Sequence, residues 1–324
     1  MERSNMTDGM HTKRRLPWPI LLLAVLTVSV ATAVHGQDRL PDTCPTGLPS
    51  LSPPEVDPHR EPSMLIPYHY TLSPQFQGCV DNHLLDPSHS MAPFFEKLRT
   101  RRNPVRIVHI GDSHVRGHVL PLVVRRHLER DFGNQAVYPD TITYQTSGLA
   151  RETGRPGVVY HMIGINGATC HSFANASQVE EIPSLHPDLI ILSFGTNESH
   201  GAYNPVRHMA QMDELITRLR NECPKACILL TTPPGSYIRY RKKRSINTRT
   251  PLVAQTIVAY ANRHGYAAWD LFNTVGGEHN ACRNWTNGGY MVRDRIHYTS
   301  EGYTLQGNLL YDALIKAYNE YVSI

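Results

Sequence analysis

From residue 105 onward, short runs of β-branched and other apolar residues alternate with longer amphipathic segments. The apolar runs predict five β-strands, at Val105–Ile110, Val158–Ile163, Leu189–Phe194, Cys227–Thr231 and Ala267–Leu271. The segments with helical spacing predict helices at Val119–Asp131, Val206–Asn221, Pro251–His264 and Ser300–Tyr321. Apolar strands separated by helices are typical of βαβ units. We therefore expect an α/β fold with a parallel sheet covered by helices.

A shorter helix is predicted just ahead of the first strand. Ser90 is a candidate N-cap, and Pro93 lies near the first turn. The apolar face of this helix consists of Phe94, Phe95 and Leu98. We expect the folded domain to begin here and to span residues 91–324.

The N-terminus has the pattern of an export signal. Basic residues at 13–15 precede an apolar run at Ile20–Ala33, and residues 34–36 form a cleavage site that ends in glycine. The apolar run is too short for a comfortable membrane span. We therefore expect residues 1–36 to be removed, leaving a periplasmic or secreted protein without stable membrane insertion. An uncleaved anchor is the alternative.

Residues 37–90 are predicted to be a proline-rich arm. Nine prolines lie between Pro41 and Pro74, and neither helical nor alternating periodicity is found there. Because proline disrupts both helices and central strands, this stretch is expected to be extended.

The composition supports a globular protein with few special features. The chain has 324 residues, of which 40% are hydrophobic and 19% charged, which is enough for a sizeable core and excludes disorder or a coiled coil. Lys and Arg number 32 against 28 Asp and Glu, and the dense basic run is Arg241–Arg244. We therefore expect no nucleic-acid partner.

Six cysteines in an exported chain indicate up to three disulfides, with free buried thiols as the alternative. They are Cys44, Cys79, Cys170, Cys223, Cys227 and Cys282. Cys223 and Cys227 form the most plausible local bridge. A zinc site would require a second Cys or His pair at short spacing, which the sequence lacks.

Candidate chemistry lies at the predicted strand ends, because ligands of open parallel sheets bind at the carboxyl edge. Ser113 follows the first strand, in the sequence Gly111-Asp112-Ser113-His114. A serine is a poor nucleophile unless a base takes its proton, and Asp294 and His297 supply an oriented base. By itself, Ser113 would by default be interpreted as a helix cap.

Two further strand ends carry residues suited to binding an oxyanion. Gly167 follows the second strand, where its backbone can approach a ligand closely, and Asn197 follows the third, where its amide can donate without bringing charge. Taken singly, both residues are explained as turn residues.

In combination, Ser113, Gly167, Asn197 and the Asp294–His297 pair resemble the four blocks of the SGNH (GDSL-like) hydrolase family. The resemblance covers Val105 to Tyr321. It implies a flavodoxin-like three-layer α/β/α sandwich with a five-stranded parallel sheet. It also implies that Ser113 is the nucleophile, His297 the general base and then acid, and Asp294 its orienting partner. The implied oxyanion hole consists of the N–H groups of Ser113 and Gly167 and the Asn197 amide, with no cofactor or metal.

Two departures from the common family pattern suggest a branch within it. His114 stands where leucine is usual, and Glu198 where aspartate is frequent. Both variants resemble periplasmic peptidoglycan O-acetylesterases and O-acetyltransferases. The resemblance implies an exported serine esterase that removes O-acetyl groups from a glycan, with peptidoglycan preferred. The alternatives are an O-acetyltransferase, an esterase of another acetylated polysaccharide, and a non-catalytic glycan-binding module.

Several residues near these motifs have a structural and a functional interpretation. His109, His114 and His118 suggest a metal cluster, but their placement in a strand and around a turn disfavours ligation. The methionines of the helix at 206–221 are interpreted as core.

The basic run Arg241–Arg244 could meet the carboxylates of an acidic glycan, although a solvated loop is the preferred interpretation. Tyr237 and Tyr240 flank this run and could stack on sugar rings. Trp285 could either line the rim of a substrate site or be buried against the last helix.

Overall fold

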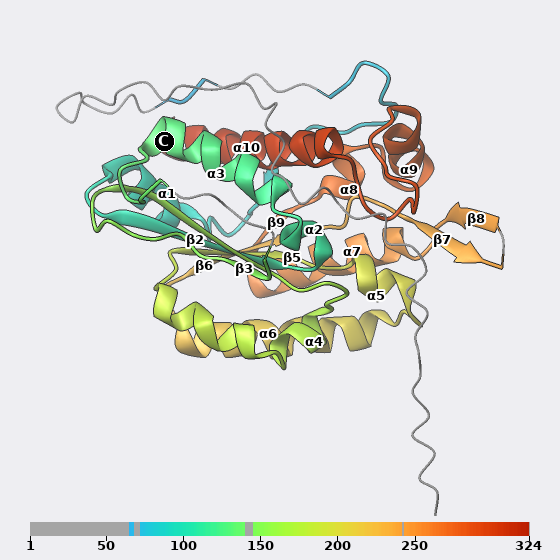
Figure 1. The fold of residues 1–324 in the computed structure, drawn as a ribbon, viewed down its shortest axis with the longest axis horizontal. Helices are drawn as coiled ribbons and strands as arrows, with labels where there is room; N and C mark the ends of the chain where they lie inside the picture. The colour runs from blue at the N-terminus through green and yellow to red at the C-terminus, as the bar shows by residue number, and fades with distance from the viewer. Residues whose placement is uncertain (1–64, 68–71, 140–144, 242, 324) are drawn as a thin grey trace, which may run out of the picture. The chain divides into compact units, whose positions relative to one another are not determined.

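The computed structural model describes residues 65–67, 72–139, 145–241 and 243–323 (Figure 1). The predicted export signal and most of the predicted arm therefore lie outside the described residues. Within them, no helix is both long enough and apolar enough to cross a bilayer.

Seven strands form one sheet in the order β1-β9-β6-β5-β2-β4-β3. The central five are parallel, as predicted, and are β2 (Pro104–Gly111), β4 (Gly157–Gly164), β5 (Leu189–Ser193), β6 (Cys227–Thr231) and β9 (Ala267–Trp269). Two short antiparallel strands complete the edges, namely β1 (Leu84–Leu85) and β3 (Ser147–Gly148). The last predicted strand ends two residues early, because Asp270 accepts a hydrogen bond from Asn273 N and begins a helix there.

Helices cover both faces of the sheet, so the fold is the expected three-layer sandwich (Figure 1). One face is covered by α1 (Ala92–Thr100), α3 (Val119–Phe132), α8 (Leu271–Thr274), α9 (Gly277–Asn287) and α10 (Ser300–Ser323). The other is covered by α4 (Cys170–Ala174), the 3-10 helix η1 (Ser177–Leu185), α6 (Pro205–Glu222) and α7 (Thr250–His264).

The buried stripe of α6 shows how the sequence pattern produces this layering. Met212, Leu215, Ile216 and Leu219 recur at helical spacing and are each at most 2% exposed. Asn204 caps the helix, because its side chain accepts a hydrogen bond from Arg207 N. These four side chains are core, as predicted, whereas Met209, which was expected in the same stripe, is only partly buried against this cluster.

Helix α1 begins close to the predicted position but has a different cap. The N-cap is Met91, and Ser90 makes no side-chain capping bond. Instead, the Asp86 carboxylate accepts hydrogen bonds from Ser90 N, Ser90 Oγ and Met91 N. A carboxylate can satisfy several donors at once, so the cap is supplied from outside the helix.

The predicted bridge between Cys223 and Cys227 is wrong. All five described cysteines have free thiols. Cys223 packs with the cluster on the α6 side of the sheet, whereas Cys227 packs with the cluster on the α10 side. Cys223 follows the last residue of α6, whereas Cys227 is the first residue of β6 and points to the opposite face of the sheet, so their closeness in sequence does not bring the two thiols together.

The basic run is also not a loop. Strands β7 (Tyr237–Tyr240) and β8 (Lys243–Ile246) form a separate antiparallel hairpin, with Arg241 in the left-handed region at its turn (φ 54°). Figure 1 shows the two strands extending away from the sheet and its covering helices.

Candidate active site

Ser113 is the first residue of the four-residue helix α2 (Ser113–Arg116), which follows β2 after the single residue Asp112. Asp112 caps this helix by accepting a hydrogen bond from His114 N at 2.9 Å. Close packing of the turn requires glycine, since a Cβ on Gly164 of β4 would lie 2.2 Å from Arg116 N. The serine is therefore held at the carboxyl edge of the sheet, where strand-end sites form.

Ser113, His297 and Asp294 form a continuous hydrogen-bonded chain. Ser113 Oγ lies 2.8 Å from His297 Nε2, and His297 Nδ1 lies 2.7 Å from Asp294 Oδ2. An ionised carboxylate can only accept, so Nδ1 carries the proton and Nε2 is left to accept from the serine hydroxyl. This is the geometry that a serine nucleophile and its base require.

The loop that carries Asp294 and His297 is shaped by the same carboxylate. Asp294 Oδ1 accepts hydrogen bonds from the backbone N–H groups of Ile296 (2.8 Å) and His297 (2.9 Å). Burial opposes ionisation, but the hydrogen bonds from the His297 side chain and these N–H groups outweigh it and hold the pKa of Asp294 below its usual value. The carboxylate is therefore charged when it meets the imidazole.

Asn197 joins the third strand end to the other two. It lies on α5 (Thr196–His200), and its Nδ2 is 2.9 Å from Ala168 O and 3.1 Å from Asp112 Oδ2. Gly167 lies one residue before Ala168 with φ at 74°, and a Cβ added to it would have no other atom within 4 Å. For Asn197 to donate to a substrate oxyanion, one of its two internal contacts must be shared or released.

Asp112 is a site residue whose role the motif analysis missed. Its carboxylate is 1% exposed and accepts from both His114 N and Asn197 Nδ2. Burial raises the pKa of Asp112 to about 7; the hydrogen bond from His114 opposes the shift, and the buried Glu198 carboxylate adds to it. The sequence signal was its position directly before Ser113.

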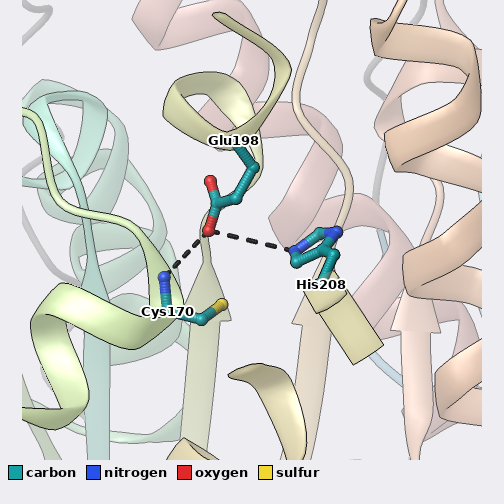
Figure 2. Close-up of side chains that lie close together, drawn as sticks. All are labelled: Cys170, Glu198 and His208. Carbon is teal, nitrogen blue, oxygen red and sulfur yellow. Dashed lines mark hydrogen bonds and ion pairs between the residues drawn. The ribbon is translucent and has the colours of Figure 1, made fainter. Parts of the chain in front are cut away.

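Glu198 ties the second and third strand ends together (Figure 2). One carboxylate oxygen accepts from Cys170 N at 2.8 Å and the other from Gly195 N at 2.9 Å. Burial raises the pKa of Glu198, with these backbone hydrogen bonds acting against it. Because Asn197 is the preceding residue, this carboxylate helps to set its position.

Glu198 also belongs to a buried cluster that has the composition of a metal site. Its carboxylate, the Cys170 thiol and His208 Nε2 offer ligand atoms within 4.8 Å of one another (Figure 2). His208 Nε2 is 3.9 Å from Glu198 Oε1 and has no hydrogen-bond partner among the described residues. Each Glu198 oxygen also accepts a hydrogen bond from a backbone N–H group, so this carboxylate has a structural role beneath the loops of the site.

The three histidines near Ser113 have separate partners. His109 contacts Tyr160 OH and Ser193 Oγ, His114 contacts Tyr303 OH, and His118 contacts Gln145 O. Burial lowers the pKa of both His109 and His114 to about 3, so these two rings are neutral. Within the part of the chain that the structure describes, they form no metal cluster.

Trp285 is fully buried and does not line a rim. Its ring packs edge-on against Phe76, Tyr290 and Tyr298, and its indole N–H donates to Pro234 O. The segment preceding β1 thus contributes to the core through Phe76.

The three-layer sandwich, with this polar site at the carboxyl edge of its sheet, defines the class as an SGNH-type acylhydrolase. The chain belongs to the GDSL-like lipase/acylhydrolase family, whose family model matches residues 109–305. The family and fold class predicted from the four motifs are confirmed. No curated protein is similar enough in sequence to count as a match.

Solved structures that this chain matches include several esterases. A peptidoglycan O-acetylesterase has a TM-score of 0.62 at 19% identity, over 73% of this chain and 99% of that one. A two-domain esterase active on acetylated mannans has a TM-score of 0.50 at 14% identity, over 75% and 58%. An acetyl xylan esterase has a TM-score of 0.48 at 16% identity, over 65% and 100%.

Proposed function

We propose that this protein is an exported serine esterase that removes O-acetyl groups from a glycan, and that the glycan is cell-wall peptidoglycan. The observation that carries the proposal is the hydrogen-bonded chain from Ser113 through His297 to Asp294. The choice of glycan is supported by His114 and Glu198 in the motifs, and by the fold shared with a peptidoglycan O-acetylesterase. A purely glycan-binding module would not need this chain of proton donors and acceptors.

The proposed reaction is a two-step acyl transfer. Ser113 Oγ attacks the acetyl carbonyl while His297 Nε2 takes the hydroxyl proton, and the charged Asp294 stabilises the resulting imidazolium. The sugar oxygen then leaves with the proton from His297, and acetyl-Ser113 remains. A water molecule attacks this ester, again with His297 as base, and acetate and free Ser113 are released.

The proposed oxyanion hole consists of Ser113 N–H, Gly167 N–H and the Asn197 amide. The open space at Gly167 leaves room for a substrate acyl group, and Asn197 is already oriented by Asp112 and Ala168. Backbone N–H groups held in place before the reaction stabilise a developing oxyanion without the cost of reorganisation, whereas the Asn197 amide must first share or release one of its two contacts.

The test is acetate release from O-acetylated peptidoglycan by the wild type, by Ser113→Ala and by the control Ser177→Ala. Ser177 is an exposed serine on η1 without a capping bond, so its loss leaves the site intact. We expect release by the wild type and the control, and a loss of about 10⁴-fold or more in Ser113→Ala.

Two results would contradict the proposal in different ways. Unchanged activity in Ser113→Ala would exclude the serine mechanism. Transfer of acetyl to an added chito-oligosaccharide, in place of acetate release, would make the enzyme an O-acetyltransferase with the same acyl-serine.

Export is proposed from the N-terminal sequence and is tested separately. Mass spectrometry of the protein after expression in a Gram-negative host should find a mature chain that starts at Gln37. An intact N-terminus in the membrane fraction would indicate an uncleaved anchor.

A further inference from the structure

The hairpin β7–β8 carries an unusual concentration of positive charge. Between Glu222 and Asp270 the sequence contains eight Lys or Arg residues and no acidic residue, and five of the eight lie within residues 239–244. Arg239, Lys243 and Arg244 are exposed. A net charge of only +4 for the whole chain means that this cationic arm is a local feature rather than a general property.

Three of these charges, those of Arg239, Lys243 and Arg244, lack an acidic partner among the described residues, and Arg239 Nε donates to the backbone carbonyl of Arg241. Arg239 lies directly opposite Arg244 in the strand register. Like charges at directly opposed positions destabilise an antiparallel pair. Repulsion between these charges therefore destabilises the free hairpin, and a bound anion would reduce that repulsion.

The first strand of the hairpin is anchored on the loop of Asp294 and His297. Tyr237 N donates to Arg295 O at 2.9 Å, and the Arg295 guanidinium lies over the Tyr237 ring at 5.0 Å. Arg295 directly follows Asp294 and adopts a left-handed backbone (φ 58°). This end of the hairpin is thus bonded to the segment that carries the proposed base.

The two residues that flank the hairpin are anchored on the helix of Asn197. Ser236 Oγ lies 3.0 Å from His200 Nε2, and Asn247 Nδ2 donates to Ser199 Oγ at 2.8 Å. Both His200 and Ser199 belong to α5, which also carries Asn197. The base of the hairpin is therefore fixed at the edge of the site, while its charged end projects outward (Figure 1).

We propose that the hairpin β7–β8 is a substrate-binding arm that contacts carboxylate groups of an anionic glycan, beyond the ester that the site cleaves. The inference rests on the proposed esterase function and names the chemical class of its substrate. A four-residue strand reaches on the order of 10 Å from its base, so the charges meet neighbouring units of the polymer and not the reacting atoms. Guanidinium groups suit this role because they bind carboxylates through two parallel hydrogen bonds.

The arm has a clear expected effect on kinetics. It contributes binding to a charged polymer, and it contributes nothing to a small neutral ester that reaches only Ser113. Its removal should raise KM for the anionic polymer and leave kcat nearly unchanged. Because the contact is electrostatic and exposed, added salt should weaken it as well.

The test uses the full-length mature protein and the triple variant Arg239→Gln/Lys243→Gln/Arg244→Gln. The matched control is Arg126→Gln/Lys225→Gln/Arg263→Gln, which removes three exposed cations elsewhere and changes the net charge equally. The substrates are O-acetylated peptidoglycan, acetylated pectin, acetylated xylan and p-nitrophenyl acetate. The first two carry carboxylates and the last two are neutral.

We expect the hairpin variant to lose at least tenfold in kcat/KM on O-acetylated peptidoglycan through KM, and to stay within twofold of the wild type on both neutral substrates. The control should resemble the wild type throughout. The wild-type preference for the anionic polymer should fall between 50 and 500 mM salt, and the hairpin variant should show little salt dependence.

Several outcomes would overturn the inference. Equal losses on charged and neutral substrates would mean that the hairpin only supports the site. Unchanged kinetics on the anionic polymers, or wild-type activity restricted to neutral esters, would exclude the contact. One outcome would instead support the inference and contradict only the proposed glycan. In that case the wild type acts on pectin but not on peptidoglycan, and the hairpin variant loses its activity on pectin. Binding of the arm to DNA or anionic vesicles without these kinetic effects would assign it to another partner.

Discussion

The loops at the carboxyl edge of the sheet and the hairpin beside them differ in how their charged groups are paired. In the loops, each carboxylate of Asp112, Asp294 and Glu198 accepts at least two hydrogen bonds from the protein itself. In the hairpin, Arg239 faces Arg244 and both are exposed. Hydrogen bonds within the protein fix the geometry of the loops, whereas charges without an acidic partner are available to a ligand. The comparison separates the part of the molecule that we propose performs the chemistry from the part that we propose selects the polymer.

The largest effect is expected from breaking the proton chain within the loops. Asp294→Asn replaces the charged acceptor of His297 Nδ1–H, so the imidazole loses its oriented tautomer. We expect kcat to fall by about 10⁴-fold on neutral and charged substrates alike. The control is Asp81→Asn, whose side chain is 74% exposed. Steady-state kinetics with p-nitrophenyl acetate measure the effect, and a loss confined to peptidoglycan would argue against the assigned role.

A smaller loss is expected from the proposed oxyanion donor. Asn197→Ala removes the amide that contacts Asp112 and Ala168, and should lower kcat by about 10²–10³-fold with little change in KM. The matched variant is Asn175→Ala, an exposed asparagine after α4. If kcat of Asn197→Ala stays near the wild-type value, the two internal contacts are its whole role.

The burial of Asp112 predicts a pH-dependent stability. Its folded pKa of about 7 lies above the unfolded value of about 4, so the native state binds the extra proton between these values. The contribution of Asp112 to stability should therefore fall as pH rises from 4 to 7, by up to about 4 kcal/mol, while the buried neutral rings of His109 and His114 contribute with the opposite sign. Urea unfolding of the wild type and of Asp112→Asn at pH 4.5 and 7.5 isolates it, since the variant should lack this part of the decline. Parallel pH profiles for the two proteins would refute the assignment.

The smallest effect is expected from Glu198, whose carboxylate accepts hydrogen bonds from the backbone of two loops of the site. Glu198→Gln keeps one carbonyl acceptor but cannot accept from both Cys170 N and Gly195 N, which leaves one buried N–H unpaired. We expect a loss of about 1–3 kcal/mol in unfolding free energy, measured by urea denaturation. Glu180→Gln is the control, because its side chain is 72% exposed. A Glu198→Gln variant as stable as the wild type would mean that the two donors find other partners.

The regular elements were predictable because their signals are local. Each of the five parallel strands is an apolar run, and helices such as α6 carry a buried stripe at helical spacing, so both can be recognised without knowing what they pack against. The residues suited to the site were found in the same way, since each follows a strand and strand ends of a parallel sheet meet at one edge.

The tertiary structure decided which of these groups meet and in what orientation. Ser113 and His297 are 184 residues apart, and their contact depends on the order of the strands in the sheet. The bond between Asn197 and Asp112 joins two different strand ends in the same way. A residue's partner across such a distance leaves no periodicity in the sequence, so the role of Asp112 was missed.

The cysteines and the basic run show the same limit on what the sequence alone can predict. Cys223 and Cys227 are close in sequence, yet the sheet between them sends their side chains into different layers. The run at 241–244 was recognisable as positive charge, but its pairing into a hairpin anchored on Arg295 and α5 depended on segments far away in the chain. Sequence alone determined the chemistry that each segment carries, because the side-chain types and the spacing of apolar residues can be read from it directly. Only the packing of the sheet decided which side chains face one another, because that depends on contacts between distant segments.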